Sequence, residues 1–507
     1  MSLSRWLALV GMAFIAIVVP GMPGRAQDGS PAAPAAKAER GDDRDADRPP
    51  SLPVDSVTHH TISLAGGRVL SFKATAGSLR LRDEKGHELA QVGYIACELD
   101  GAEVKSRPVT FVFNGGPGAG SAWLNIGAIG PWRLPMEAGK IYPSAPPLLV
   151  DNSETWLDFT DLVFIDPPGT GYSRITATGD EVRKSLWSVD GDIQALTVVV
   201  RRWLAQNQRL ESPKFIAGES YGGFRGPRLA EELALKEGIG INGLVLISPA
   251  LDFSADDGAF YWLDRLPAYT AAHREQSGPV TRGQLADVER YAIGDYLQDY
   301  LRGPRDTEAV ARMVQRVTEL TGLDPALVKR LGGRIDKTTF QREILRPEGK
   351  VVGFYDATVS AYDPEPASNY NNWHDPALEG LEAPMTSSIM DLYNRELGWK
   401  TAERYEILNG RVGGSWDWGD HLSPPSSMDA LRGMLALDPH FRVLVTGGLT
   451  DIQIPYFQNK RLLDQVPDYG PPGRLQFKVY GGGHMFYSRD DSRKALHEDA
   501  RIVVEGP

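Results

Sequence analysis

The amino-acid sequence predicts an α/β fold, built on a mainly parallel sheet with helices on its faces. Short apolar runs recur along the chain, as in strands that are buried on both faces of a parallel sheet. Stretches with helical spacing, residues 193–204 and 229–235, lie between some of these runs and give the strand–helix alternation of this fold class. The apolar runs are Val109–Phe113, Leu162–Ile165, Phe215–Ala217, Leu244–Ile247, Val443–Val445 and Leu475–Val479.

Composition and charge exclude several classes of protein. Of the 507 residues, 42% are apolar and 24% are charged, which excludes disordered, collagen-like and polytopic membrane proteins. The formal net charge of −12 argues against a nucleic-acid partner, whose phosphates repel an acidic chain. The sequence has one cysteine, Cys97, so neither an intramolecular disulfide nor a cysteine-based zinc site can form. It also lacks a His-Glu-x-x-His pattern, and it implies no metal and no cofactor.

The chain begins with the pattern of a signal peptide, residues 1–26. Arg5 supplies a positive start, an apolar run follows over Trp6–Pro20, and small residues lead to a cleavage site after Ala26. A transmembrane anchor is the weaker alternative, because this run is shorter than the roughly 20 residues that a bilayer requires. An exported chain with a single cysteine is typical of a bacterial periplasmic or extracellular protein. We therefore expect export, with no membrane partner after cleavage.

Two kinds of segment precede the first buried run. Residues 27–53 are rich in Ala, Pro, Asp and Arg without apolar periodicity, which predicts a disordered tether. From Thr61 to Leu99, short alternating runs are separated by Gly66-Gly67, Gly77 and Gly86. Alternation with glycine punctuation is typical of an antiparallel β-meander.

The strand–helix alternation stops over residues 253–438. This interval has helical patterns over 285–301, 309–320 and 325–331, followed by aromatic, Asn-rich and Pro-rich segments. The strand series resumes at Phe441, so we interpret the interval as a mainly helical cap inserted over the carboxyl edge of the sheet. A second independent domain is the alternative.

Ser220 is the candidate nucleophile. It lies in the segment 218–222, Gly-Glu-Ser-Tyr-Gly, between the apolar run 215–217 and a stretch that is compatible with a helix. This Gly-x-Ser-x-Gly pattern is typical of a strained strand-to-helix turn that projects the serine. A serine hydroxyl needs a base and an orienting carboxylate, and in this fold class the acid and then the histidine follow it along the chain.

His484 and Asp451 are the candidate base and acid. His484 follows the last apolar run and three glycines, 481–483, which indicate close backbone approach or positive φ. Asp451 follows the run at 443–445, which places it at the carboxyl edge of the sheet. The alternative role of Asp451 is to cap a turn or a helix, and both roles are compatible.

A glycine loop after the first buried run is the candidate oxyanion hole. Residues 114–118 read Asn-Gly-Gly-Pro-Gly, and we expect the N–H groups of Gly116 and Tyr221 to stabilise an oxyanion. A phosphate cradle is the alternative, but this loop lacks the Gly-Lys-Ser/Thr ending and contains a proline, which has no N–H.

These segments, taken in order, resemble the serine carboxypeptidase family (peptidase S10), in the manner of a bacterial secreted member. The resemblance implies an α/β-hydrolase fold with a core over 54–252 and 439–507, a mainly helical cap insertion over 253–438 and an N-terminal β-meander. It also implies release of C-terminal amino acids from peptides. The matching segments are Asn114–Gly118, Ile165–Ser173, Gly218–Gly223, Thr450–Asp451 and Gly482–Met485.

The resemblance assigns substrate binding to Asn114, Gly115, Glu219 and Met485, with Asn114 and Glu219 at the terminal carboxylate of the peptide. Glu219 then faces another carboxylate, and two such groups repel unless they share a proton. Proton sharing raises the apparent pKa of the pair, which accounts for the acidic pH preference of the family.

The sequence departs from the family at three positions. Ala119 stands where the family has a loop cysteine, Val112 where it has a tryptophan, and Ala128 where it has a glutamate. Val112 and Ala128 correspond to the family's carboxylate-binding network. The resemblance therefore supports a catalytic triad of Ser220, Asp451 and His484 more directly than it supports specificity for C-termini.

The predicted function is that of a secreted serine exopeptidase, which cleaves a peptide substrate at its C-terminus through an acyl-enzyme. One alternative is an esterase, acyltransferase or aminopeptidase-type hydrolase with the same triad. Another is a non-catalytic module that binds a ligand through aromatic cap residues, for which core packing is the other possible role. The sequence predicts neither the oligomeric state nor the preferred side chain at the scissile bond. The cap residues in question are Tyr370, Trp373, Trp416 and Trp418, together with Asn371, Asn372 and Asp417.

Overall fold

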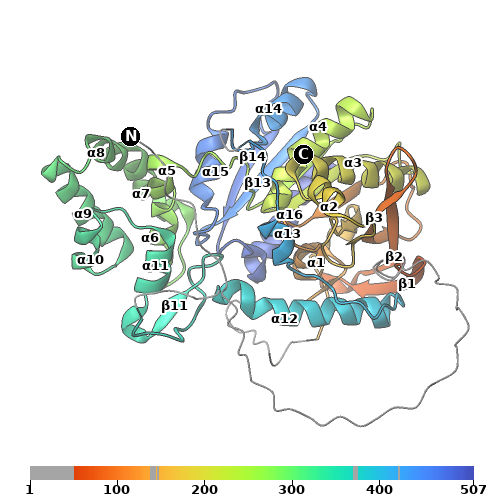
Figure 1. The fold of residues 1–507 in the computed structure, drawn as a ribbon, viewed down its shortest axis with the longest axis horizontal. Coiled ribbons are helices and arrows are strands. Elements are labelled where there is room, and N and C mark those ends of the chain that lie inside the picture. The colour runs from red at the N-terminus through yellow and green to blue at the C-terminus, as the bar shows by residue number, and fades with distance from the viewer. Residues whose placement is uncertain (1–50, 137–143, 145–147, 369–374, 421–422, 507) are drawn as a thin grey trace, which may run out of the picture. The chain divides into compact units, whose positions relative to one another are not determined.

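A ten-stranded sheet organises the part of the chain that the computed structural model describes, residues 51–136, 144, 148–368, 375–420 and 423–506 (Figure 1). The strand order is β1-β2-β3-β7-β4-β9-β10-β13-β14, with β8 paired to β3. Neighbours from β7 to β14 are parallel, whereas the pairs β1–β2, β2–β3 and β3–β7 are antiparallel. The strands are β1 (Ser56–Ser63), β2 (Val69–Arg82), β3 (Glu88–Leu99), β4 (Val109–Phe113), β7 (Asp161–Ile165), β8 (Arg174–Ile175), β9 (Lys214–Glu219), β10 (Gly243–Ile247), β13 (Arg442–Gly448) and β14 (Leu475–Tyr480).

All six predicted buried runs are strands of this sheet, namely β4, β7, β9, β10, β13 and β14, so the predicted α/β class is confirmed. The chain passes from β4 outward to β7 and then returns to form β9 on the other side of β4. This reversal is a topological switch point, and ligands of open α/β sheets bind beside the carboxyl ends of the strands at such a point. The ends of β4 and β9 carry the candidate oxyanion loop and Ser220.

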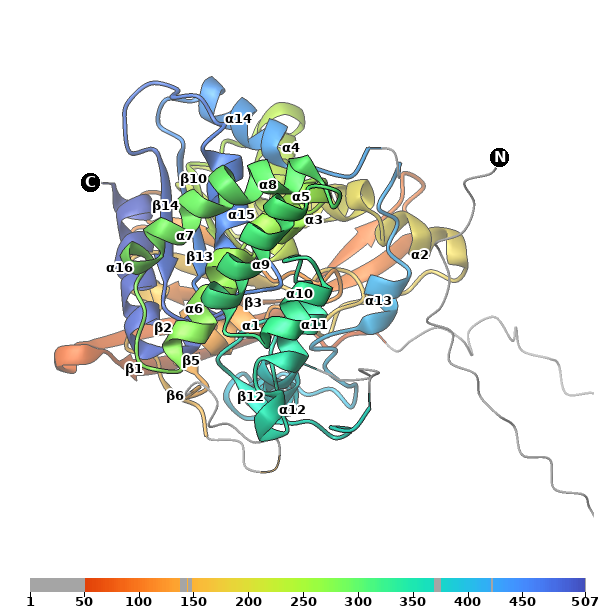
Figure 2. The ribbon, with the colours of Figure 1, turned by 90° about the vertical axis from the view of Figure 1, so that its left-hand side faces the viewer.

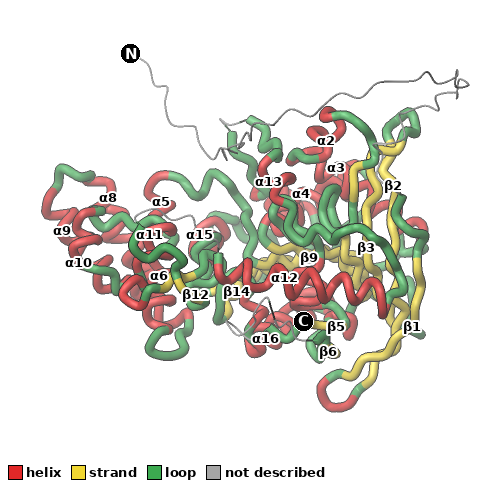
Figure 3. The backbone as a smooth tube through the Cα atoms, turned by 60° about the horizontal axis from the view of Figure 1, so that its bottom comes forward, coloured by secondary structure: helices red, strands yellow, loops and turns green. Residues whose placement is uncertain are grey.

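The predicted antiparallel meander forms one side of the sheet (Figure 3). Turns fall at Gly66-Gly67 and at Gly86, as expected, but Gly77 lies inside β2, opposite Tyr94 of β3. The prediction of a break at Gly77 is therefore wrong. The carboxylate of Asp55 occupies the space where a Cβ on Gly77 would stand, and it accepts the Tyr94 hydroxyl at 3.1 Å. Close approach of a neighbouring side chain, not a turn, requires this glycine.

Helices cover both faces of the sheet because its strands are apolar on both sides. In β4, Phe111 and Phe113 pack with α3, α4 and α14, whereas Val112 between them packs on the opposite face with α12 and α16. Side chains of successive strand residues point to opposite faces, which explains this division. The helices outside the predicted cap are α1 (Ala122–Leu124), α2 (Asp180–Leu186), α3 (Val189–Gln206), α4 (Tyr221–Lys236), α15 (Tyr456–Leu463) and α16 (Asp490–Glu505).

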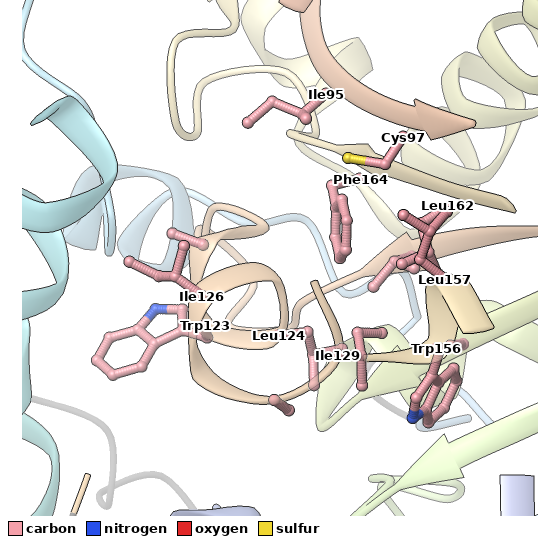
Figure 4. Packing of buried hydrophobic residues seen from close by; sticks show 14 of the residues in the cluster. Ile95, Cys97, Trp123, Leu124, Ile126, Ile129, Trp156, Leu157, Leu162 and Phe164 are labelled. Atoms are coloured by element: carbon pink, nitrogen blue, oxygen red, sulfur yellow. The ribbon is translucent and has the colours of Figure 1, made fainter. Parts of the chain in front are cut away.

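The single cysteine lies in the apolar core on one face of the sheet. Cys97 is fully buried in the same cluster as Ile95, Leu162 and Phe164 (Figure 4). Burial raises the pKa of the Cys97 thiol. The thiol therefore stays protonated and acts as a small apolar side chain.

Helices α5 to α11 lie between β10 and β13 in chain order and form a separate group to one side of the sheet (Figure 1), which Figure 2 shows from the front. The predicted helical patterns at 285–301, 309–320 and 325–331 are confirmed by α7–α8, α9 and α10. The apolar side chains of the group pack against Leu449, Ile452, Tyr456 and Phe457 at the end of β13 and in α15. The members are α5 (Gly258–Leu263), α6 (Leu266–Glu275), α7 (Ala286–Tyr291), α8 (Leu297–Arg302), α9 (Thr307–Thr321), α10 (Pro325–Arg330) and α11 (Lys337–Glu343).

The later part of the predicted cap packs differently. Helix α12 (Pro376–Asp391) contributes to the core on one face of the main sheet, and α14 (Met428–Leu437) to the core on the other. The cap boundaries at residues 253 and 438 stay a prediction. The predicted signal peptide and most of the predicted tether lie outside the described residues, as do Tyr370, Asn371, Asn372 and Trp373. The smaller elements are α13 (Gly410–Gly414) and the short hairpins β5 (Trp132–Arg133) with β6 (Val150–Asp151) and β11 (Lys350–Val352) with β12 (Ser360–Tyr362).

A search of the helices in the described part of the chain finds none that is both long enough and apolar enough to span a bilayer.

Candidate active site

Ser220 lies where β9 ends and α4 begins, and its backbone is strained. Its φ of 60° and ψ of −121° are unfavourable for a residue with a side chain. Two glycines permit the turn: a Cβ on Gly218 would lie 2.1 Å from the carbonyl oxygen of Gly222, and one on Gly222 would lie 2.5 Å from that of Phe113. The segment therefore folds as a tight strand-to-helix turn of the kind that its pattern predicts.

His484 and Asp451 are joined by a buried hydrogen bond, in which Nδ1 of His484 lies 2.6 Å from Oδ2 of Asp451. The other oxygen of Asp451 accepts the N–H groups of Gln453 and Ile454 at 2.9 Å each. The orienting bond and the turn-capping bonds thus coexist on one carboxylate. Within the described residues, Nε2 of His484 is buried and has no hydrogen-bond partner, which leaves it available for a serine proton.

The protonation of His484 depends on the charges around it. Burial lowers the pKa of His484, but the charge and hydrogen bond of the Asp451 carboxylate, together with the charges of Glu219 and Asp375, raise it by more. The net result is a pKa above the ordinary value for histidine. Such an environment stabilises the imidazolium that forms when the ring accepts a proton.

The end of β10 anchors both Ser220 and His484. The N–H of Ser220 donates to the carbonyl oxygen of Ile247 at 2.9 Å. The hydroxyl of the next residue, Ser248, donates to the carbonyl oxygen of His484 at 2.8 Å. Two consecutive residues therefore hold the candidate nucleophile and the candidate base at the carboxyl edge of the sheet.

The glycine loop after β4 lies directly against this turn. A Cβ on Gly115 would stand 2.6 Å from the backbone nitrogen of Tyr221 and 2.8 Å from the Cβ of Ser220. Gly116, the next residue, has a φ of +98°, which favours glycine. The loop and the N-terminus of α4 are thus adjacent, as an oxyanion hole built from Gly116 and Tyr221 requires.

Glu219 is buried beside Ser220 and is bound by neutral donors. The side-chain amide of Asn114 donates to Oε2 of Glu219, and the hydroxyl of Tyr487 lies 2.9 Å from Oε1 and 3.1 Å from Oε2. Burial raises the pKa of Glu219 to about 7, although His484, Tyr487 and Asn114 act in the opposite direction. Asn114 is itself oriented, since its Oδ1 accepts the N–H of Leu124 at 3.0 Å. No motif in the sequence pointed to Tyr487.

Tyr487 also lies beside the turn that contains Ala128. A Cβ on Gly127 would lie 3.3 Å from the ring of Tyr487, and Gly127 precedes Ala128 in a buried turn of π-helix, Asn125–Ile129. Met485, two residues before Tyr487, is buried in the same loop. Val112 packs in the apolar core, and Ala119 pairs with Leu408 in an isolated β-bridge.

A segment between β11 and β12 inserts between the loops that carry Asp451 and His484. The carbonyl oxygen of Phe354 accepts the N–H groups of Ile452 and Gln453, and that of Tyr355 accepts the N–H of His484. The ring of Tyr355 stands edge-on to the ring of His484, with their centroids 4.9 Å apart. No pattern in the sequence indicated this contact, because the segment has neither helical nor strand periodicity.

Two of the predicted cap aromatics pack around Tyr221. The ring centroid of Tyr221 is 5.4 Å from that of Trp416 and 5.7 Å from that of Trp418, and Phe253 joins the cluster. Trp416 is buried and Trp418 is half-buried. Asp417 between them forms a turn, in which its side chain accepts the N–H of Gly419.

Comparison with known proteins finds a match between residues 66–261 and the family model described as serine carboxypeptidase. Serine carboxypeptidase-like 12 of Arabidopsis thaliana is 27% identical over 162 residues, which is 30% of this chain and 35% of that protein. The pheromone-processing carboxypeptidase KEX1 of Yarrowia lipolytica is 22% identical over 429 residues, which is 83% of this chain and 59% of that protein. The matches thus cover about a third to six-tenths of the length of these relatives.

Solved structures similar to this chain include the proline iminopeptidase of Mycobacterium smegmatis, with a TM-score of 0.35 and 12% identity over 88% of this chain and 98% of that one. Esterase E22 has a TM-score of 0.35 and 11% identity over 89% of this chain and 99% of that one. The fold follows from the sheet itself, in which β9 leads into the strained serine turn and β13 and β14 lead into the acid and histidine loops. The chain therefore has the α/β-hydrolase fold, and its residues 66–261 are similar to serine carboxypeptidases.

Proposed function

We propose that this protein is a serine carboxypeptidase that releases amino acids from the C-termini of peptides. The observation that carries the proposal is the buried Glu219, which is bound by Asn114 and Tyr487 and directly precedes the strained Ser220. The hydrogen bond between His484 and Asp451 supplies the base for the same site. Similarity to carboxypeptidases over residues 66–261 supports the assignment.

The chemistry proceeds in two balanced steps. The hydroxyl oxygen of Ser220 attacks the scissile carbonyl carbon while Nε2 of His484 takes its proton, and the N–H groups of Gly116 and Tyr221 stabilise the oxyanion. The C–N bond then breaks as His484 returns the proton to the departing amine. In the second step His484 takes a proton from water, the hydroxide adds to the acyl carbon, and Ser220 leaves with that proton.

Glu219 and Asn114 recognise the C-terminal carboxylate of the peptide. With a pKa of about 7, Glu219 is protonated at acidic pH and can donate to the substrate carboxylate. The amide of Asn114 supplies a second donor. Ionisation of Glu219 places two negative charges in contact, so binding of free C-termini weakens as the pH rises toward and beyond neutral.

Two measurements on the purified protein test this function. A fluorophosphonate should label wild type at Ser220, and Ser220→Ala should abolish both labelling and peptide hydrolysis, while the exposed Ser387→Ala should behave as wild type. Mass spectrometry of a peptide with a free C-terminus should show stepwise loss from that end. The matching C-terminal amide should react on the order of 100-fold more slowly or worse, because the site then leaves its buried polar groups unpaired.

The same experiment distinguishes the alternatives. Val112 and Ala128, at positions where the family binds the carboxylate, favour a second candidate, an esterase, acyltransferase or aminopeptidase-type hydrolase. Such an enzyme would be labelled at Ser220 but would not discriminate between the free acid and the amide. A non-catalytic binding module would show neither labelling nor turnover.

A further inference from the structure

The carboxylate of Asp356 joins the two loops that carry the candidate acid and base. Its Oδ1 accepts the hydroxyl of Thr450 at 2.8 Å, and its Oδ2 accepts the N–H of Gly483 at 3.0 Å. Thr450 directly precedes Asp451, and Gly483 directly precedes His484. The side chain of Asp356 is 9% exposed, so these bonds form away from bulk water.

Asp356 is itself held in place by its own segment. The N–H and hydroxyl of Thr358 donate to Oδ1 of Asp356 at 2.9 and 2.6 Å. The N–H of Ala357 donates to the carbonyl oxygen of Thr450 at 3.0 Å. The segment between β11 and β12 is thus bonded through both backbone and side chain to the loop after β13.

The position of the Asp356 carboxylate therefore affects the distance between the loop that carries Asp451 and the loop that carries His484. The loops after β13 and β14 belong to neighbouring parallel strands, and the bond from His484 to Asp451 spans the gap between them. A displacement of about 1 Å at reacting groups lowers rates by about 100-fold. A buried acceptor that bonds to the residue before each partner limits such a displacement.

We propose that Asp356 is a positioning residue for the pair formed by His484 and Asp451, and that the segment 353–358 thereby sets the reactivity of Ser220. This inference rests on the proposed function only through the triad, and not through the nature of the substrate. The competing explanation is that Asp356 merely fastens its hairpin to the rest of the protein. The two explanations differ in whether loss of the Asp356 bonds changes His484 itself.

Charged groups from several elements surround His484 and Asp356, and Lys337 acts on Asp451 and Asp375. Asp451, Glu219 and Asp375 act on His484. Nη2 of Arg489 lies 3.6 Å from Oδ2 of Asp356, and Arg489 also pairs with Glu275 and with the hydroxyl of Thr358. Because Asp451 is the strongest of the charges that raise the pKa of His484, separation of the pair lowers that pKa.

The test compares Asp356→Asn with wild type in the full-length protein. Asn can keep one acceptor oxygen but presents an N–H₂ group, which cannot accept the N–H of Gly483. We expect the rate of Ser220 labelling by a fluorophosphonate to fall by about 10- to 100-fold. In the pH profile of the labelling rate, we expect the acid limb to move to lower pH. We also expect the downfield NMR signal of the His484 ring proton that is bonded to Asp451 to shift or vanish.

Further variants distinguish a role of Asp356 in positioning His484 and Asp451 from a role in fastening its hairpin to the protein. Thr450→Val removes one bond to Asp356 without changing side-chain volume much, and Thr450→Ser restores that bond and should rescue the labelling rate. Asp264→Asn, which removes a buried cap carboxylate paired with Arg461 at 2.7 Å, should lower the melting temperature but leave labelling and the His484 signal unchanged. If Asp356→Asn fails to fold, the comparison of Thr450→Val with Thr450→Ser tests the proposal instead.

The outcomes are distinguishable. Absence of labelling at Ser220 in wild type would overturn the proposed function. Wild-type labelling together with unchanged rates, acid limb and ring-proton signal in folded Asp356→Asn or in Thr450→Val would overturn the positioning role. An equal slowing in Asp264→Asn would also overturn it, because general destabilisation would then explain the effect.

Discussion

The hydroxyl of Tyr487 contacts both carboxylate oxygens of Glu219, at 2.9 and 3.1 Å. Together with the amide of Asn114, it provides neutral donors to a carboxyl group that is 3% exposed. Neutral donors orient a carboxylate without supplying a positive charge, so burial dominates and the pKa of Glu219 rises to about 7. This arrangement makes Glu219 a proton donor in mildly acidic solution and an anion above neutral pH.

Tyr487→Phe should weaken recognition of the free C-terminus more than it weakens the chemistry. Loss of the phenolic donor raises the pKa of Glu219 further, since Tyr487 acts to lower it. We expect KM for peptides at acidic pH to rise by about two- to tenfold, as for the loss of a hydrogen bond between neutral groups, with kcat changed much less. The decline of kcat/KM toward neutral pH should move to higher pH.

A matched control is Tyr480→Phe, which removes a similar bond, from a phenol to Asp499 at 2.6 Å, that does not involve Glu219. It should leave KM and the pH profile as in wild type. Equal effects of the two substitutions, or a fall in kcat at constant KM for Tyr487→Phe, would contradict a role for Tyr487 in recognition.

Glu219→Gln should change how stability depends on pH. In the folded protein the pKa of Glu219 is about 7, against 4.5 as its ordinary value, so between these values the folded state binds more protons than the unfolded state. Stability of wild type relative to Glu219→Gln therefore falls as the pH rises through this window. At about 1.4 kcal/mol per pH unit, the difference in the free energy of unfolding should grow by roughly 3 kcal/mol.

Urea unfolding of wild type and Glu219→Gln at several pH values between about 4 and 8 measures this difference in the free energy of unfolding. Glutamine cannot titrate, and the contributions of other groups cancel in the difference between the two proteins, except that of His484, whose pKa Glu219 raises. A difference that stays constant with pH would show that Glu219 titrates normally in the fold.

Gly222→Ala should disrupt the turn at Ser220. The added Cβ would lie 2.5 Å from the carbonyl oxygen of Phe113 and 3.0 Å from that of Asn114, and backbone atoms of a buried strand cannot move cheaply. We expect kcat to fall by about 100-fold or more, because the glycine loop and Ser220 are pushed apart. Gly226→Ala in the same helix is the control, since its Cβ would meet no backbone atom closely and its nearest contact would be the end of the Leu246 side chain at 2.8 Å. Similar losses in both variants would argue against a specific role of the turn.

The parts of the site that the sequence predicted are those encoded by short segments. Strand runs, the glycines around Ser220 and the glycines before His484 each determine backbone shape within a few residues, so their patterns are visible without the fold. Tyr487 and Asp356 were missed because their partners are distant in the chain: Tyr487 is 268 positions from Glu219, and Asp356 is 94 positions from Thr450. A break was wrongly predicted at Gly77 for the same reason, since Asp55 comes close to it only in the folded sheet.

A buried ion pair beneath the serine turn provides a final prediction. Nε of Arg225 in α4 lies 2.6 Å from Oδ2 of Asp192 in α3, and the same guanidinium donates to the carbonyl oxygen of Asn114 in the candidate oxyanion loop. Burial raises the pKa of Asp192, and Arg225 opposes that rise. Arg225→Ala leaves the Asp192 carboxylate buried and unpaired, so we expect it to destabilise the protein by about 3–5 kcal/mol.

The same two helices offer a matched control for this pair. Arg228 and Asp190 form a salt bridge at 2.8 Å, but their side chains are 27% and 77% exposed. Solvent screens that pair, so Arg228→Ala should change the free energy of unfolding by less than about 1 kcal/mol. Asp192→Asn combined with Arg225→Ala should recover part of the loss, because no buried charge then remains. Chemical unfolding of wild type and the three variants measures these differences. Equal losses of stability for Arg225→Ala and Arg228→Ala would mean that burial does not determine the strength of the ion pair.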